Sequence, residues 1–145
     1  MKRKLFVVLM ALCLSVPAAG CGGSEEKAAE ENAEVKLQFG ELLDVTENAA
    51  DNSVVVKAKI QPSVTNDATI RQNYHNIVYL VTDYGFDKYD TIKYWAVADM
   101  TDGKEAKVIQ FTVPKETIDG IANEQIFGTN MDSYIEDLFL HPSLR

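Results

Sequence analysis

The chain has 145 residues, 46% of them hydrophobic, and its 22 Asp and Glu against 14 Lys and Arg give a net charge of −8. This length suffices for one domain with a sizeable core but is short for two. The acidic balance excludes the basic stripe that nucleic-acid binding requires, so no nucleic-acid partner is expected.

The first 21 residues follow the order of a secretory signal. Met1 to Lys4 is basic, Leu5 to Val16 is apolar, and three small residues precede Cys21. The apolar stretch is too short to span a bilayer, because a transmembrane helix needs roughly 20 apolar residues. This N-terminus resembles the signal peptides of bacterial lipoproteins, in which small residues precede a cysteine that is lipidated and becomes the first residue of the mature chain. Ala18 departs from the leucine that is usual at its position.

The resemblance implies that residues 1–20 are removed as a signal peptide and that a lipid on Cys21 anchors the chain to the extracytoplasmic face of the cell membrane. Two or more acyl chains make such anchoring stable. The alternative, an uncleaved anchor helix, also leaves the rest of the chain outside the cytoplasm. Removal of three of the 14 Lys and Arg leaves a net charge of −11, so an anionic membrane surface repels the domain.

Residues 21–34 are interpreted as the lipidated cysteine and an acidic flexible tether. After Cys21 this segment has no large apolar residue and carries five glutamates against one lysine. It cannot bury enough apolar surface to offset the entropy of ordering. As a flexible coil it spans on the order of 20 Å. The alternative is a short helical extension of the domain.

Residues 35–145 are expected to form a single globular domain that begins with a β-hairpin. Val35, Leu37 and Phe39 alternate with polar residues, which predicts a strand that continues past Gly40 to Val45. A second strand is predicted over residues 53–61, after the turn-forming residues 47–52.

A helix follows, with Thr69 as N-cap, Gln72 in a capping box and Gly85 at its end. The segments 91–99 and 106–113 predict a second hairpin around Asp102-Gly103. Pro114 opens a short helix, and a last helix is predicted over Tyr134–Phe139. The order β-β-α-β-β-α-α predicts an α+β fold: a four-stranded antiparallel sheet with helices packed on one face.

Two segments of the globular part resemble small exported lipoproteins of Gram-positive, clostridia-type bacteria. They are VVVKAKIQPSVTNDATIRQNYHNIVYLV (Val54–Val81) and YWAVADMTDGKEAKVIQFTV (Tyr94–Val113). The resemblance supports the localisation and carries over no functional residues.

Catalytic patterns are missing from the sequence. His75 and His141 are the only imidazole bases, and no G-x-S-x-G, S-x-x-K or H-E-x-x-H pattern is present. We therefore expect no enzyme activity and no cofactor. Asp99, Asp102 and Glu105 flank one turn and offer oxygen ligands to Ca²⁺, but an acidic turn is usually only solvated, so no metal is expected.

Two surfaces are candidates for binding. Trp95 and Val97 form an aromatic patch if they face away from the helices; the alternative is that Trp95 is core and Tyr94 half-exposed. Arg71, Gln72 and Asn73 lie on a helix side that is poor in charge. The sequence thus predicts a membrane-anchored, non-enzymatic binding module of the cell envelope that recognises an envelope protein, a peptide or a wall polymer. The alternatives are a small-ligand receptor associated with a transporter and an envelope hydrolase.

Overall fold

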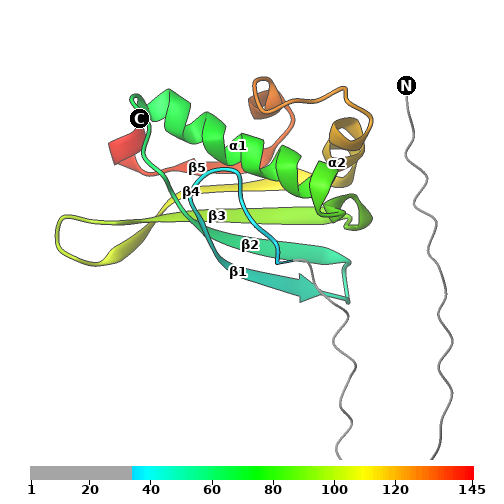
Figure 1. Cartoon of the computed structure of the whole chain (residues 1–145), viewed down its shortest axis with the longest axis horizontal. Coiled ribbons are helices and arrows are strands. Elements are labelled where there is room, and N and C mark those ends of the chain that lie inside the picture. Colours follow the sequence, from blue (N-terminus) through cyan, green and yellow to red (C-terminus); the bar gives the residue numbers. More distant parts are fainter. Residues whose placement is uncertain (1–33) are drawn as a thin grey trace, which may run out of the picture. The chain divides into compact units, whose positions relative to one another are not determined.

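The computed structural model describes residues 34–145, so the predicted signal peptide, Cys21 and all but the last residue of the predicted tether lie outside the described residues. In this part of the chain, no helix is long and apolar enough to cross a membrane. The described residues form five strands, two α-helices and three short 3₁₀ turns (Figure 1). In chain order these are β1 (Glu41–Asn48), β2 (Ser53–Lys59), α1 (Asn66–Asp83), η1 (Phe86–Lys88), β3 (Thr91–Asp99), β4 (Glu105–Pro114), α2 (Lys115–Ala122), η2 (Met131–Ser133), β5 (Glu136–Leu140) and η3 (Pro142–Leu144).

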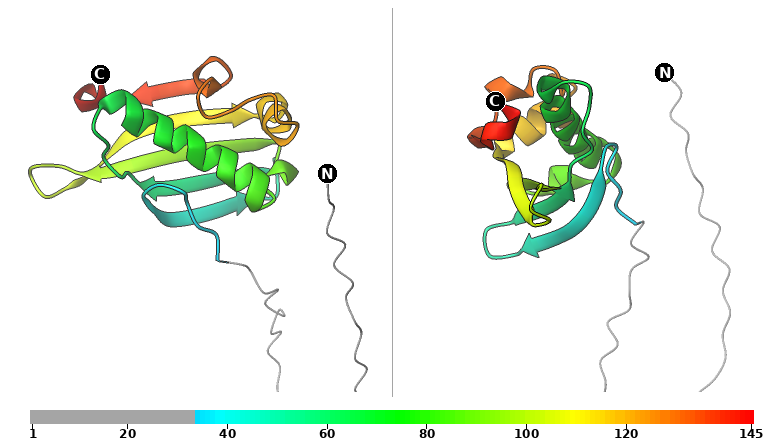
Figure 2. Two further views of the ribbon diagram at one scale, coloured as in Figure 1. Left: turned by 45° about the horizontal axis from the view of Figure 1, so that its top comes forward. Right: turned by 90° about the vertical axis from the view of Figure 1, so that its left-hand side faces the viewer.

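The strands form one mixed sheet in the order β1-β2-β3-β4-β5. β1–β2, β3–β4 and β4–β5 are antiparallel, whereas β2 and β3 are parallel. The predicted α+β class is confirmed, but the all-antiparallel sheet is wrong at its centre. Neighbouring parallel strands need a crossover connection. Helix α1, which follows β2 and precedes β3 in the chain, provides it by running back across one face of the sheet (Figure 2).

The predicted last helix is also wrong, because that segment supplies the fifth strand. Residues Glu136–Leu140 form β5, which pairs with β4 through Ile109↔Leu140 and Gln110↔Phe139. The apolar spacing near the C-terminus fits a helix, but Asp137 has φ +53°, which no right-handed helix permits. Pairing satisfies backbone groups that β4 would otherwise leave at an open edge.

The chain before β1 does not belong to the sheet, contrary to the strand predicted there, and it bends at residues 38–40. Val35, Leu37 and Phe39 are partly buried while the residues between them are exposed, so the alternation is real. Phe39 N–H donates to Asn76 Oδ1 (2.8 Å), and Asn76 Nδ2 donates to the Phe39 carbonyl (2.9 Å). An asparagine side chain of α1 thus takes the place of a neighbouring strand.

Helix α1 begins earlier than the capping pattern predicted. Thr65 is its N-cap, and the Thr65 hydroxyl accepts a hydrogen bond from Ala68 N–H (3.1 Å). The predicted cap, Thr69, is buried in the first turns, where its hydroxyl donates to the Thr65 carbonyl (3.1 Å) and accepts from Ser63 N–H (2.9 Å). Thr69 fits the capping box with Gln72, whereas Thr65 is followed three residues later by Ala68 and caps the helix through its hydroxyl alone.

Helices α1 and α2 lie on one face of the sheet and leave the other uncovered (Figure 2). Side chains of β2, β3 and β4 that point toward the helices alternate with side chains that do not. The fully buried, largest members of the core are Tyr94, Phe111, Ile77, Leu80, Ile92, Ile109, Ile118, Ile121, Met131, Val54, Val56 and Val108. Hydrophobic burial on this single face provides the main driving force for folding.

A polar network lies inside this apolar core. Tyr94, fully buried on β3, donates from its hydroxyl to Asn73 Oδ1 (2.9 Å) and accepts from Asn76 Nδ2 (3.0 Å). Asn73 Nδ2 in turn donates to the Thr69 carbonyl (2.7 Å). Burial raises the pKa of Tyr94, so the phenol stays protonated and keeps donating to Asn73 throughout the physiological range.

Replacement of Tyr94 by phenylalanine tests this network. The substitution preserves the ring but leaves Asn73 Oδ1 buried without its donor, so we expect a loss of about 1–3 kcal/mol in the free energy of unfolding. Urea denaturation measures it, with Tyr134→Phe at an exposed tyrosine as the matched control, expected to change stability by less than about 0.5 kcal/mol. Equal stability of the two variants would contradict the role assigned to the Tyr94 hydroxyl.

Candidate functional site

The uncovered face of the sheet carries an aromatic row. Trp95 on β3 lies opposite Gln110 on β4, and Gln110 lies opposite Phe139 on β5, so the three side chains point to the same side. Trp95 and Phe139 are each 39% exposed, whereas Tyr94 is fully buried on the other side of β3. Of the two alternatives that the sequence left open, the structure thus has Trp95 outward and Tyr94 in the core.

Lys107 joins this row because β4 contains a β-bulge. Ala96 pairs with Ile109 but Val97 pairs with Lys107, so Val108 is an extra residue on β4. Val108 and Ile109 are both buried in the core, and the side-chain alternation reverses beyond them. If the same residues alternated regularly, without a bulge, Val108 would point outward and Lys107 would point toward the helices.

The Lys107 ammonium group is shared between the two aromatic rings. Its Nζ lies 5.3 Å from the Trp95 ring centroid and 5.8 Å from that of Phe139, both within the range of cation–π attraction. The same Nζ donates to Gln110 Oε1. We define the open-face patch as Lys93, Trp95, Lys107, Gln110 and Phe139.

Val97 points to the open face together with Trp95, but it is only 5% exposed and therefore adds little to the contact surface. Two ion pairs surround it: Lys57 with Glu105 (3.0 Å) and Lys59 with Asp99 (2.7 Å). The hydrogen bond to Asp99 raises the pKa of Lys59. Val97 lies between Lys59 of β2 and Lys107 of β4, and the aliphatic stems of these two lysines can shield it from solvent.

Lys93 and Lys107 differ from the other lysines of the open face, since neither forms an ion pair with any of residues 34–145. Lys93 lies between Val55 of β2 and Thr112 of β4, one row away from Trp95. The aromatic row is thus flanked on both sides by a cation that forms no ion pair within the described part of the chain. Lys93 still attracts the Asp51 carboxylate, whose pKa is lowered by its hydrogen bond with Ser53 and also by the charge of Lys93.

The three predicted residues of α1 do not form one surface. Arg71 is exposed and pairs with Asp67 (3.2 Å) one turn earlier, whereas Asn73 is only 3% exposed and holds Tyr94. The prediction that Asn73 faces outward is therefore wrong. Gln72 is partly buried, and its Oε1 has no hydrogen-bond partner among the described residues. The buried asparagines of this helix account for part of its low density of charge.

A second feature is a hollow of about 510 Å³ between α2 and the segment that leads into β5. One hydrogen bond joins its walls, from Thr117 Oγ1 to the Tyr134 carbonyl (2.6 Å). Two carboxylates line it, but no histidine or cysteine does. The lining residues are Pro114, Glu116, Thr117, Gly120, Gln125, Ile126, Ser133, Tyr134, Ile135 and Glu136.

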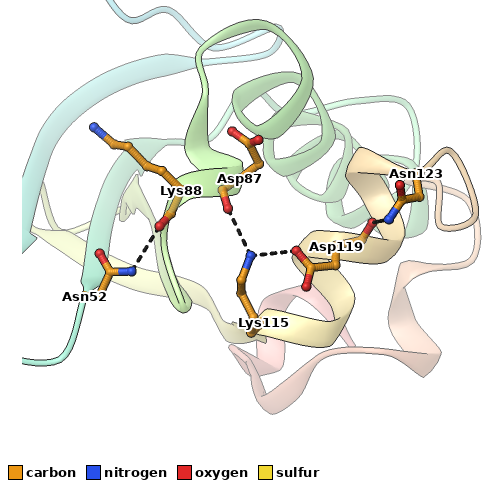
Figure 3. Close-up of polar contacts among 6 residues, drawn as sticks. All are labelled: Asn52, Asp87, Lys88, Lys115, Asp119 and Asn123. Atoms are coloured by element: carbon orange, nitrogen blue, oxygen red, sulfur yellow. Dashed lines mark hydrogen bonds and ion pairs between the residues drawn. The ribbon is translucent and has the colours of Figure 1, made fainter.

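The polar groups beside α2 form a structural junction, shown in Figure 3. Lys115 Nζ donates to the Asp87 carbonyl (3.1 Å) and to Asp119 Oδ1 (2.6 Å), and the bond to Asp119 raises the pKa of Lys115. Asn52 Nδ2 donates to the Lys88 carbonyl (3.0 Å). The bonds of Lys115 connect η1 to α2, and the bond of Asn52 connects the turn after β1 to η1. The polar groups of this junction thus bind one another.

The acidic turn after β3 has other partners than a metal. Asp99 and Glu105 pair with lysines, and Asp102 Oδ1 accepts from Lys104 N–H (3.0 Å). Among residues 34–145, no group of three or more His, Cys, Asp or Glu is arranged to hold a metal ion.

His141 has a hydroxyl neighbour, Ser143, that no sequence pattern predicts. His141 Nδ1 lies 2.9 Å from Ser143 Oγ, but the same nitrogen also accepts from Ser143 N–H (3.2 Å) and so caps η3. The His75 ring lies beside the Phe39 ring, with 6.5 Å between the two ring centroids, and next to Gly128. Both histidines therefore have local structural roles.

Comparison with known proteins gives no match: no family model fits the chain, and no curated protein or solved structure is significantly similar to it. The resemblance of residues 54–113 to exported lipoproteins stays a prediction. The candidate site rests on the geometry of the open sheet face.

Replacement of Trp95 by alanine tests whether this side chain contributes to folding. Because Trp95 lies outside the core, we expect a loss of about 1 kcal/mol or less. Phe111→Ala on the neighbouring strand is the comparison, since Phe111 is fully buried and its loss should cost about 3–5 kcal/mol. Thermal or urea unfolding measures both. A Trp95→Ala loss as large as that of Phe111→Ala would exclude a surface role.

Proposed function

We propose that this protein is a membrane-anchored, extracytoplasmic binding module of the cell envelope that is lipidated at Cys21 and contacts its partner through the open-face patch. The observation that carries the proposal is the row of Trp95, Gln110 and Phe139, with Lys107 shared between the two rings. No catalytic role is proposed for any residue.

Exposed aromatic side chains on a sheet face favour a binding role. Clustered exposed apolar surface marks interaction sites, and aromatic residues with two rotatable bonds lose little entropy on binding. Trp95 and Phe139 are on strands whose backbones are fixed by pairing with β4, so their positions need little ordering when a partner arrives. This preorganisation reduces the entropic cost of association.

The sequence of the N-terminus supports the location. The basic start, the short apolar stretch and the small residues before Cys21 resemble a lipoprotein signal. The composition of residues 22–34 is that of a tether, which as a flexible coil would span on the order of 20 Å. Repulsion between the acidic domain and an anionic membrane holds the domain away from the head groups, which leaves the patch accessible to envelope components.

Replacement of Cys21 by serine tests the anchor. Without the thiol no lipid can be attached, so the variant should be released from the membrane fraction or accumulate as an uncleaved precursor. Fractionation of cells with immunoblotting measures both the distribution and the size of the chain. Cys13→Ser is the matched control and should behave as the wild type. Processing of Cys21→Ser with full retention in the membrane would contradict the lipoprotein proposal.

Photocrosslinking in intact cells tests the contact surface. A photoreactive residue at Gln110 lies between Trp95 and Phe139, and one at Arg71 lies on the exposed side of α1. We expect a dominant adduct from Gln110 that is missing from Arg71. Adducts from Arg71 alone would favour the helix, and no adduct from either position would contradict binding through this face.

A small-ligand receptor associated with a transporter is the second candidate function. The hollow between α2 and β5 favours it, since its volume of about 510 Å³ lies within the range of small-molecule sites. Thr117 already uses its hydroxyl to bind the Tyr134 carbonyl, so fewer polar groups are left in the hollow to orient a ligand.

A further inference from the structure

The proposed function does not specify the chemical class of the partner, but the side chains of the open-face patch indicate one. Resting on that function, we propose that the ligand is an anionic glycan chain that lies along the row of Trp95, Gln110 and Phe139. Three features of the patch favour this ligand: the spacing of the rings, the cations beside them, and the pairing of β3 and β4 along both of their edges.

The spacing of the two aromatic rings fits a polymer of sugar rings. Trp95 and Phe139 are separated by two strand spacings, which places their backbones about 10 Å apart. That is close to the length of a disaccharide unit in an extended β-1,4-linked glycan, in which alternate rings present the same face. Trp95 can therefore stack on one sugar and Phe139 on the next sugar but one. The amide of Gln110 faces the sugar between these two.

The cations of the patch favour a negatively charged chain. Lys93 and Lys107 lie on either side of the aromatic row and form no ion pair within residues 34–145, whereas Lys57 and Lys59 on the same face do. A carboxylate or phosphate on the ligand would provide the missing partners. Because the chain as a whole has a net charge of −8, an anionic polymer is repelled elsewhere and is attracted to this patch.

A peptide fits the same surface poorly. β3 and β4 are paired along both of their edges, so a peptide could add as a strand only at the outer edge of β5, on the far side of Phe139 from Trp95 and Gln110. An amphipathic helix needs a continuous apolar groove, but here polar Thr112, Lys93 and Lys107 surround the rings. Recognition by side chains alone, through stacking and charge, is what a glycan uses.

Isothermal titration calorimetry of the mature, lipidated chain (residues 21–145) in detergent tests the proposal with three probes. The probes are a β-1,4-linked mannuronate hexasaccharide, cellohexaose as its uncharged counterpart, and a short inorganic polyphosphate that has charge but no sugar rings. We expect the mannuronate oligomer to bind, cellohexaose to bind on the order of tenfold more weakly, and polyphosphate to show no saturable binding.

Variants assign the binding to the patch. Trp95→Ala and Phe139→Ala should each weaken binding of the mannuronate oligomer on the order of 30-fold, as loss of an aromatic anchor does. Lys93→Ala with Lys107→Ala should remove both the preference over cellohexaose and the salt dependence of binding. Phe127→Ala, at a more exposed aromatic (51%) outside the sheet, and Arg71→Ala, at a cation on α1, are the matched controls and should bind as the wild type.

Several outcomes would overturn the glycan proposal. If the mannuronate oligomer does not bind, or binds Trp95→Ala as well as the wild type, the glycan proposal is wrong. Binding of polyphosphate with equal strength would show that charge alone accounts for the interaction and would also overturn it. A Gln110 adduct in cells that contains a single protein would overturn the glycan and keep the binding module, whereas no adduct at Gln110 would count against both.

Discussion

The hydroxyl of Tyr94 and the two asparagines that hold it are the constraint on which the rest of the structure depends. Asn73 and Asn76 belong to α1, Tyr94 belongs to the central strand β3, and Asn76 also binds both backbone groups of Phe39. One buried network thus fixes the helix on the sheet and closes the core with the chain before β1. A buried polar group without its partner costs about 1–3 kcal/mol, so this arrangement disfavours other positions of α1.

That fixed helix face determines which side of the sheet becomes a surface. Tyr94 must point toward α1, and because side chains alternate along a strand, Trp95 must point away. The bulge at Val108 then reverses the alternation on β4, which buries Val108 and Ile109 together and turns Lys107 outward. The open-face patch is therefore a consequence of two features of the core.

The charged residues of the open face separate a region of ion pairs from the aromatic row. Ion pairs of Lys57 with Glu105 and of Lys59 with Asp99 cover Val97, while the cations beside Trp95 and Phe139 form no ion pair among the described residues. Exposed ion pairs contribute little stability, so their main effect here is to shield an apolar side chain and to confine the aromatic surface to one row. The proposed glycan would supply negative charge to a part of an acidic protein where it is not repelled.

The sequence by itself determined the elements with strong local signals. The second hairpin with its Asp102-Gly103 turn, the strand over residues 91–99, the α+β class and the short helix after Pro114 all follow from local patterns, and the structure has them. Only the tertiary structure decided how β2 and β3 pair, because parallel pairing depends on where a crossover helix packs. The same holds for Glu136–Leu140, whose local pattern fits a helix but which pairs with the open edge of β4. It holds also for Asn73 and Lys107, because the buried network and the bulge that orient these side chains are made by contacts between distant parts of the chain.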